Sequence, residues 1–260
     1  MRNLVMSVAA VAAVALGIGA VHASDELSDA RVILEAKSGT IKKWAHAPQF
    51  VVVHDRPVNE AAFADTIAFI EAATGLGIAA PVFVDLAAAG LDDRFFSGTL
   101  YEPARGPTGQ YRTTLSVAAR DRIAVAGSVF VFMVAPRYAS HLMVLSGFGH
   151  GSQTLERAYH ASPRHCFFNV MSDARSIQFG RILISPEQDM AQQATCIYEE
   201  MTQAMGLMRD AEGSAHFTYD NLAEDKPRDN DRRLLAALYH PSVLTGDGVD
   251  KVVEIYAAAR

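Results

Sequence analysis

The stretch TCIYEEMTQAMGL, residues 195–207, carries the most specific pattern in this chain. Its apolar residues recur at spacings of three and four, which is typical of the buried stripe of an amphipathic helix. That stripe consists of Ile197, Met201, Ala204 and Met208. Glu199, Glu200 and Gln203 lie beside it. The plainest interpretation of these three polar residues is a solvated helix face, and the alternative is a functional site at the edge of the core.

The helix that contains this stretch is predicted to run from about residue 186 to residue 205. Ser185 is a candidate N-cap, and Pro186 suits the first helical position. Gln188 completes the S-x-x-Q pattern of a capping box. Gly206 is the expected left-handed stop, because glycine adopts positive φ values at little steric cost.

The rest of the chain alternates between strand and helix patterns. Short apolar, β-branched runs predict strands at residues 49–54, 81–85, 128–135, 166–170 and 177–185. Apolar residues three and four apart predict a helix after Pro57 that stops near Gly75 or Gly77. Two C-terminal helices are predicted at 232–239 and 250–259. No repeat or linker divides residues 24–260, so we expect a single α+β domain.

The composition is that of an ordinary globular protein. Of its 260 residues, 50% are hydrophobic and 20% are charged, which is enough apolar material for a sizeable core. The formal net charge is −6, and the sequence contains no run of lysine or arginine. This balance argues against nucleic acid as a partner, because that affinity depends on clustered cations. An anionic membrane surface is disfavoured for the same reason.

Residues 1–23 have the pattern of a secretory signal peptide. Arg2 supplies a positive start, Leu4–Val21 is uncharged, and small residues precede a cleavage point before Ser24. The alternative is an uncleaved anchor, since about 18 apolar residues just span a bilayer. Alanine and glycine dominate the stretch and hold it only weakly in lipid, which favours cleavage. We therefore expect a periplasmic or secreted protein without stable membrane insertion.

Export changes the interpretation of the two cysteines. Cys166 and Cys196 are the only pair in the sequence, and an oxidising compartment permits a disulfide between them. Such a bridge would stabilise the fold by about 3–4 kcal/mol in the chain-entropy account. The alternative is two buried free thiols, which would be the first expectation in a cytosolic protein.

The polar residues of the 195–207 stretch have the spacing of a zinc-peptidase helix. In that motif, H-E-x-x-H, two histidines bind one metal and the intervening glutamate activates its water. Aligning the Ala-Met-Gly-Leu segment with the A-L-G-L that commonly follows the motif places Glu199 and Gln203 at the two ligand positions. Glu200 falls on the general-base position. The third ligand position falls on Arg209, a cation that cannot bind a metal.

This donor set is unsuited to zinc. Catalytic zinc normally has three protein ligands and prefers imidazole and thiolate, so we expect no metal and no cofactor. Oxygen ligands suit calcium or magnesium better, and Asp210 is one candidate that the spacing does not require. His216 follows the helix closely and is the histidine whose approach to Glu199 or Glu200 would overturn this interpretation.

Three motifs give the chain a resemblance to a known family. They are C-I-x-E-E-x-x-Q-x-x-G-L at Cys196–Leu207, D-x-x-L-L-x-x-L-Y-x-P at Asp231–Pro241, and A-T-G-L at Ala73–Leu76. With these motifs the chain resembles a family of exported proteobacterial proteins whose domain has no established function and which look related to the zinc-peptidase (zincin) fold. Arg209 departs from the asparagine that is common in that family. The resemblance implies a zincin-like mixed sheet whose central helix lines a cleft with Glu199, Gln203, Arg209, Asp210 and His216.

The function that this resemblance implies is a degenerate metallopeptidase. Such a pseudoenzyme would act as a non-catalytic binding or accessory module of the cell envelope, with a peptide, glycan or protein as its partner. The alternative is an active hydrolase that uses Glu200 as a general base with an atypical metal or none. A third hypothesis is a structural envelope protein, which predicts that no cleft with polar walls lies beside Glu200.

Overall fold

The computed structural model describes residues 26–36, 39–88, 102–105, 111–114, 127–135, 166–173, 176–211 and 228–259. Its strands are β1 (Gln49–His54), β2 (Val82–Asp85), β3 (Glu102–Arg105), β4 (Tyr111–Thr114), β5 (Ser128–Met133), β6 (Cys166–Ser172) and β7 (Ile177–Ile184). Its named helices are α2 (Glu60–Thr74), α7 (Met190–Gln203), α8 (Asp229–Leu238) and α9 (Val249–Ala258). Residues 26–34 are also helical. The expectation of an α+β fold is confirmed.

The main sheet has five strands in the order β2-β1-β5-β7-β6. β2, β1, β5 and β7 run parallel to one another, whereas β6 is antiparallel to β7. The chain enters β7 directly from β6, and a short turn of this kind can join only antiparallel strands. Because the strand order ends with β6, this strand forms one edge of the sheet within the described residues. β3 and β4 form a separate two-stranded antiparallel sheet.

All five strands of the main sheet were predicted from the sequence to within a few residues. The helix after Pro57 is also confirmed, because α2 begins at an N-cap formed by Asn59, whose side chain accepts from Ala62 N. It ends where Gly75 adopts φ 67, in the left-handed region. The helix at residues 26–34 was not predicted, although Leu27, Ala30 and Leu34 follow helical spacing.

The predicted start of the central helix, residue 186, is wrong. α7 begins at Met190, and residues 186–188 form a turn instead. Asp189 is the N-cap, and its side chain accepts from the backbone N–H groups of Ala191 and Gln192. Because the backbone N–H of Asp189 donates in turn to Gln192 Oε1, this capping box is complete and determines where the helix begins. The helix ends at Gln203, two residues earlier than expected.

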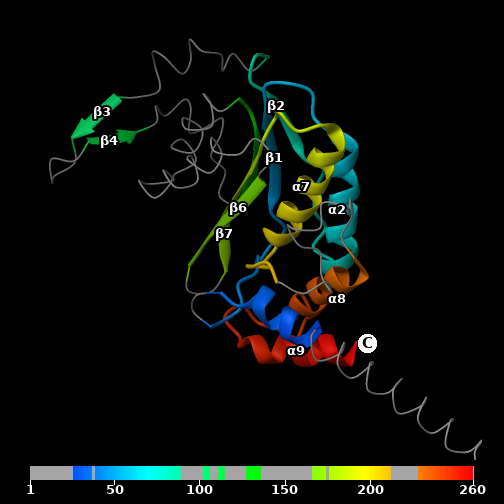
Figure 1. Cartoon of the computed structure of the whole chain (residues 1–260). Coiled ribbons are helices and arrows are strands. Elements are labelled where there is room, and N and C mark those ends of the chain that lie inside the picture. The colour runs from blue at the N-terminus through cyan, green and yellow to red at the C-terminus, as the bar shows by residue number, and fades with distance from the viewer. Residues whose placement is uncertain are drawn as a thin grey trace, which may run out of the picture.

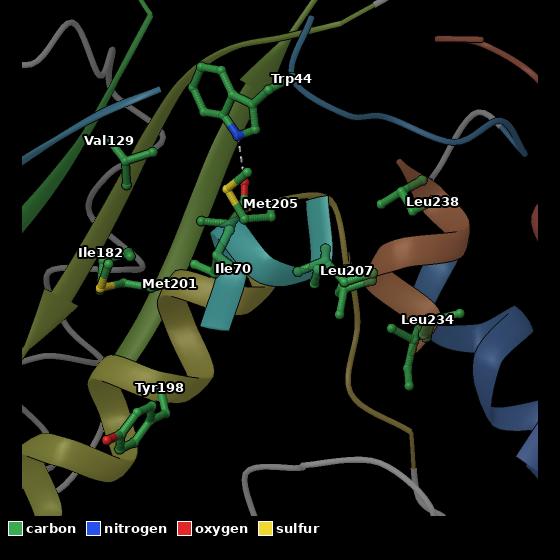
Figure 2. Close-up of a cluster of buried hydrophobic side chains, with 14 of the residues drawn as sticks. Trp44, Ile70, Val129, Ile182, Tyr198, Met201, Met205, Leu207, Leu234 and Leu238 are labelled. Atoms are coloured by element: carbon green, nitrogen blue, oxygen red, sulfur yellow. Dashed lines mark hydrogen bonds between the residues drawn. The ribbon is translucent and has the colours of Figure 1, made fainter. Parts of the chain in front are cut away.

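Helices cover one face and one end of the sheet. α2 and α7 lie side by side against the sheet (Figure 1). At the end of the sheet, α8 and α9 lie together with the helix of residues 26–34, which alone of the three is drawn in blue. Glu26 ties this group together, since it pairs with Arg233 at 3.1 Å and accepts a hydrogen bond from Tyr256. The elements share one hydrophobic core, in which Met201 of α7 packs near Ile182 of β7 (Figure 2).

None of the described helices is long and apolar enough to cross a membrane. The predicted signal peptide, residues 1–23, lies outside the described residues.

Candidate functional site

The second half of α7 is buried on every side. Each residue of Cys196–Gln203 is buried, including Glu199 and Glu200, which are only 4% and 3% exposed. The interpretation of the polar residues as a solvated face is therefore wrong. The reason is tertiary: α7 packs against α2 on one side and against β6 and β7 on another, so its polar edge has little access to water.

A disulfide joins Cys166, the first residue of β6, to Cys196 in α7. This confirms the bridge predicted from the cysteine pair and excludes the alternative of two free thiols. Gln188 adds a hydrogen bond, since its Nε2 lies 3.4 Å from Cys196 Sγ. The edge strand and the central helix are thus covalently connected at the buried glutamate pair.

Glu200 is a carboxyl group near this connection whose pKa is strongly shifted. Burial raises the pKa of Glu200 well above its ordinary value of 4.5, and the negative charges of Glu199 and Asp210 raise it further. Its Oε2 atom is buried without a hydrogen-bond partner. Because an isolated buried carboxylate is costly, Glu200 holds its proton at pH values where an exposed glutamate is ionised.

The raised pKa of Glu200 predicts that the protein loses stability as the pH rises. The folded state binds more protons than the unfolded state above the unfolded pKa of about 4.5. The contribution is therefore complete below that pKa and declines at higher pH, with a slope of up to about 1.4 kcal/mol per pH unit. In urea unfolding from pH 5 to pH 8, Glu200→Gln should flatten this decline, whereas the exposed control Glu187→Gln should retain it. Equal slopes in both variants would contradict the assignment.

The turn after α7 is fixed by hydrogen bonds from two distant segments. Trp44 Nε1 donates to the carbonyl of Ala204 at 2.9 Å, as the dashed line in Figure 2 shows. The hydroxyl of Tyr239 donates to the carbonyl of Met205 at 2.8 Å and accepts from Trp44 N at 3.1 Å. Gly206 follows with a positive φ of 120, but α7 already ends at Gln203 with Ala204 as its C-cap, so Gly206 lies in the turn after the helix. These contacts hold the chain so that the next residues, including Arg209, reach the surface at a defined place.

A cleft of about 700 Å³ opens beside this turn. Three chain segments line it: β6 with the residue after it, the segment after α7, and the segment after the first helix. The lining residues are Phe168, Asn169, Val170, Ser172, Asp173, Met208, Arg209, Glu35, Ala36 and Lys42. Its walls are mixed: Phe168, Val170 and Met208 are apolar, and charged groups surround them. The volume is within the usual range of ligand sites, about 300–1,000 Å³.

The charged groups of the cleft are held in place by neighbours. Lys42 is only 8% exposed, and its Nζ donates to the carbonyl of Asp173 at 3.3 Å. Arg209 Nη1 lies 3.6 Å from Glu35 Oε2 on the cleft lining, with both side chains about half exposed. This second pair is weak because water screens it, so both groups remain available to a bound molecule.

A second, much smaller cavity lies directly against the helix. It has a volume of about 20 Å³ and is lined by Ile33, Glu199, Thr202, Gln203, Leu207, Arg209 and Asp231. This space holds about one water molecule and excludes a peptide side chain. Arg209 lines both the cleft and this cavity.

The structure brings most of the predicted site residues together but in different roles. Glu199, Gln203 and Arg209 line the small cavity, whereas Glu200 lines neither space. Asp210 is exposed and accepts a hydrogen bond from Gln203 Nε2. His216 lies outside the described residues.

The three positions that would hold zinc in the peptidase motif do not fit that metal. Gln203 uses its amide to donate to Asp210, and Arg209 places a guanidinium group at the same cavity. Among these three positions only Glu199 supplies an anionic donor. Catalytic zinc sites use three protein ligands from histidine, cysteine and carboxylate side chains. These three positions supply only one such ligand, so no catalytic step through zinc can be derived from them.

Sequence reasoning missed the residues that shape the cleft. Lys42 and Glu35 come from a segment without a motif, and Asn169 was assigned only to a strand. One sequence feature could have pointed to the cleft: Asn169 is a polar residue within the otherwise apolar CFFNV run. An isolated polar residue in such a run is compatible with an edge strand, but the strand order that places it there is not visible in the sequence.

The comparison with protein families gives one result. The model for a protein of unknown function (DUF2927) matches residues 111–258, which include β5, β6, β7 and the helices from α7 to α9. β1, α2 and β2 lie before the match, as do Lys42 and Trp44. No curated protein and no solved structure matches the chain significantly. Because the match covers more than half of the 260 residues, the chain belongs to the DUF2927 family.

Proposed function

We propose that this protein is a non-catalytic binding module of the cell envelope, which holds an extended peptide segment in the cleft beside β6. The observation that carries the proposal is the cleft itself, about 700 Å³ with polar and apolar walls. The third hypothesis, a structural envelope protein, predicts that no cleft with polar walls lies beside Glu200. Glu200 lines neither this cleft nor the small cavity, so the proposal depends on the cleft beside β6. The mixed sheet with α7 packed against it is also the arrangement that the zincin-like resemblance implies.

The shape of the cleft favours a peptide. Phe168, Asn169 and Val170 are consecutive residues that all line it, although neighbouring side chains of a strand point to opposite faces. The cleft therefore reaches the outer edge of β6, which has no neighbouring strand within the described residues. Such an edge presents backbone N–H and C=O groups in a row, and an extended peptide can pair with them. Lys42 and Arg209, which also line the cleft, would bind carbonyl or carboxylate groups of the same peptide.

The second candidate function, an active hydrolase with Glu200 as general base, has one observation in its favour. A raised carboxyl pKa is common among catalytic residues. A general base must however lie within hydrogen-bonding reach of the substrate. Glu200 is buried and lines neither space, and the cavity against α7 holds only about one water molecule. The burial of Glu200 and the small size of this cavity favour binding over hydrolysis.

Export is part of the proposal. The uncharged stretch Leu4–Val21 supports it, and so does the disulfide, because such bonds persist in oxidising compartments. A periplasmic or secreted location would place the cleft among envelope peptides. N-terminal sequencing of the protein recovered from the periplasm should give Ser24 as its first residue. A protein recovered with residues 1–23 still attached would contradict cleavage.

A large side chain that fills the cleft should weaken peptide binding strongly. Ser172 is exposed and lines the cleft, so Ser172→Trp would occupy the space without disturbing the core. Peptides captured from a random decapeptide mixture by the wild-type protein should bind this variant about tenfold more weakly or worse. The measurement is fluorescence anisotropy with the captured peptides.

The matched control is the preceding residue. Met171 is equally part of β6 and is 49% exposed, but it does not line the cleft, so Met171→Trp should bind the peptides as the wild type does. If the two tryptophan variants bind equally well, the cleft is not the binding site. If the wild type captures no peptide, the proposed ligand class is wrong.

A further inference from the structure

Three potential metal donors meet where β6 joins α7. Cys166 Sγ and one carboxylate oxygen each of Glu199 and Glu200 all lie within 4.8 Å of one another. Glu199 and Glu200 are 4% and 3% exposed, and Cys166 is half-buried. The positions of these donors differ from those of the peptidase motif, because Cys166 comes from the edge strand. One thiolate and two carboxylates form a three-donor set of the kind that binds zinc with an open fourth position.

The disulfide prevents this set from binding a metal. Its sulfur atoms share electrons with each other, and only a thiolate is a good metal ligand. The cluster is nevertheless complete in position, since Cys166 needs only to be released from Cys196. A further observation points to a ligand here: Glu200 Oε2 is fully buried and has no hydrogen-bond partner. A bound cation would provide that partner.

We propose that reduction of the Cys166–Cys196 disulfide creates a divalent-metal site of Cys166, Glu199 and Glu200, with Zn²⁺ as the preferred ion. Zinc is preferred because it binds a thiolate more tightly than calcium or magnesium does. Cys196 is not a member of the cluster, and Gln188 Nε2 donates to its sulfur at 3.4 Å. That hydrogen bond would keep Cys196 in place while Cys166 binds the ion. The inference is independent of whether the cleft binds a peptide.

The chemistry balances with a dithiol as the reductant. The dithiol passes two electrons and two protons to the disulfide and becomes a disulfide itself, and Cys166 and Cys196 become thiols. Cys166 and Glu200 then each lose a proton to water as the cation binds. Without the cation, a thiolate beside two carboxylates is disfavoured by repulsion of like charge. Zinc should therefore favour the reduced form, and the protein would bind the ion only where it is reduced.

The two single-cysteine variants provide the sharpest test, because they lose the same disulfide. Cys196→Ser leaves the three donors intact and frees Cys166, so this variant should bind one Zn²⁺ without any reductant. Cys166→Ser removes the donor from β6 and should bind zinc at least about tenfold more weakly. The measurement is competition with a chromophoric zinc chelator, using the full mature chain. Substitution of Co²⁺ should give a thiolate-to-cobalt absorption band in Cys196→Ser only.

The wild-type protein provides a second, independent measurement. With a dithiol present it should bind one zinc ion, and in its oxidised form it should bind none. Glu200→Gln, which preserves size, should weaken zinc binding to the reduced protein at least about tenfold, whereas the exposed control Glu187→Gln should leave it unchanged. Circular dichroism records whether each variant is folded. If neither cysteine variant folds, the zinc titrations of the reduced and the oxidised wild type decide whether the site exists.

Several results would overturn the proposal. Equal zinc affinity in Cys166→Ser and Cys196→Ser would show that the cluster is not the site. Zinc binding by the oxidised wild type would show that it does not depend on reduction. Failure of the reduced protein to bind zinc, or unfolding on reduction that zinc does not prevent, would also exclude the site.

Discussion

Replacing Gly206 with alanine is expected to lower the free energy of unfolding by about 2–6 kcal/mol, the sum of backbone strain and overpacking. Gly206 has φ 120, a value that residues with a side chain rarely adopt. A methyl group there would clash with the carbonyl oxygen of Lys42 and would lie 3.0 Å from Leu238 Cδ2. The backbone of Lys42 cannot move away easily, because Ile41 and Trp44 on either side are buried.

Gly75 is the matched control for this substitution. It also has a positive φ, 67, but a methyl group added there would meet nothing within 4 Å. Gly75→Ala should therefore cost only the backbone term, about 1–2 kcal/mol. The difference between the two variants in urea unfolding reports the close approach of Gly206 to Lys42 together with the larger backbone strain at φ 120. Equal losses would contradict the packing described for the turn after α7.

Removing the disulfide is expected to lower the free energy of unfolding by about 3–4 kcal/mol. The bridge closes a loop with a sequence separation of 30, so its loss increases the conformational freedom of the unfolded chain. The double variant with Cys166→Ser and Cys196→Ser tests this by urea unfolding without a metal. The two serines are similar in size to the cysteines, so the substitution adds little cavity cost.

Reductant provides the control for the double variant. A dithiol should reduce the stability of the wild type to that of the double variant, and it should leave the double variant unchanged. If the double variant is as stable as the oxidised wild type, then the connection between β6 and α7 does not contribute to stability. If the dithiol alters the double variant, its effect does not act through this disulfide.

The architecture could be predicted largely because its strands are short apolar runs separated by turn residues. The runs at 49–54 and 128–135 have no competing helical pattern, and each forms a central strand. The start of α7 could not be predicted in the same way. Two capping patterns follow each other directly, S-x-x-Q at Ser185 and D-x-x-Q at Asp189. Local sequence favours both, and the folded structure uses only the second.

The candidate site could be predicted only in part, because burial depends on distant segments. Glu199 and Glu200 have ordinary positions beside an apolar stripe, and nothing local distinguishes a solvated pair from a buried one. Their burial follows from the packing of α7 against α2 and the β6–β7 pair. The cleft likewise combines Lys42 with Arg209 and Ser172, residues that are far apart in the sequence and are brought together only by the tertiary fold.

The measurement that tests the proposed function most directly is mass spectrometry of a random decapeptide mixture incubated with the oxidised mature protein. We predict that a subset of peptides is retained and recovered at full length, by the wild type and by Glu200→Gln alike. Ser172→Trp should lose this subset. Shortened peptides that appear with the wild type and not with Glu200→Gln would contradict the account, because they would identify Glu200 as a catalytic residue.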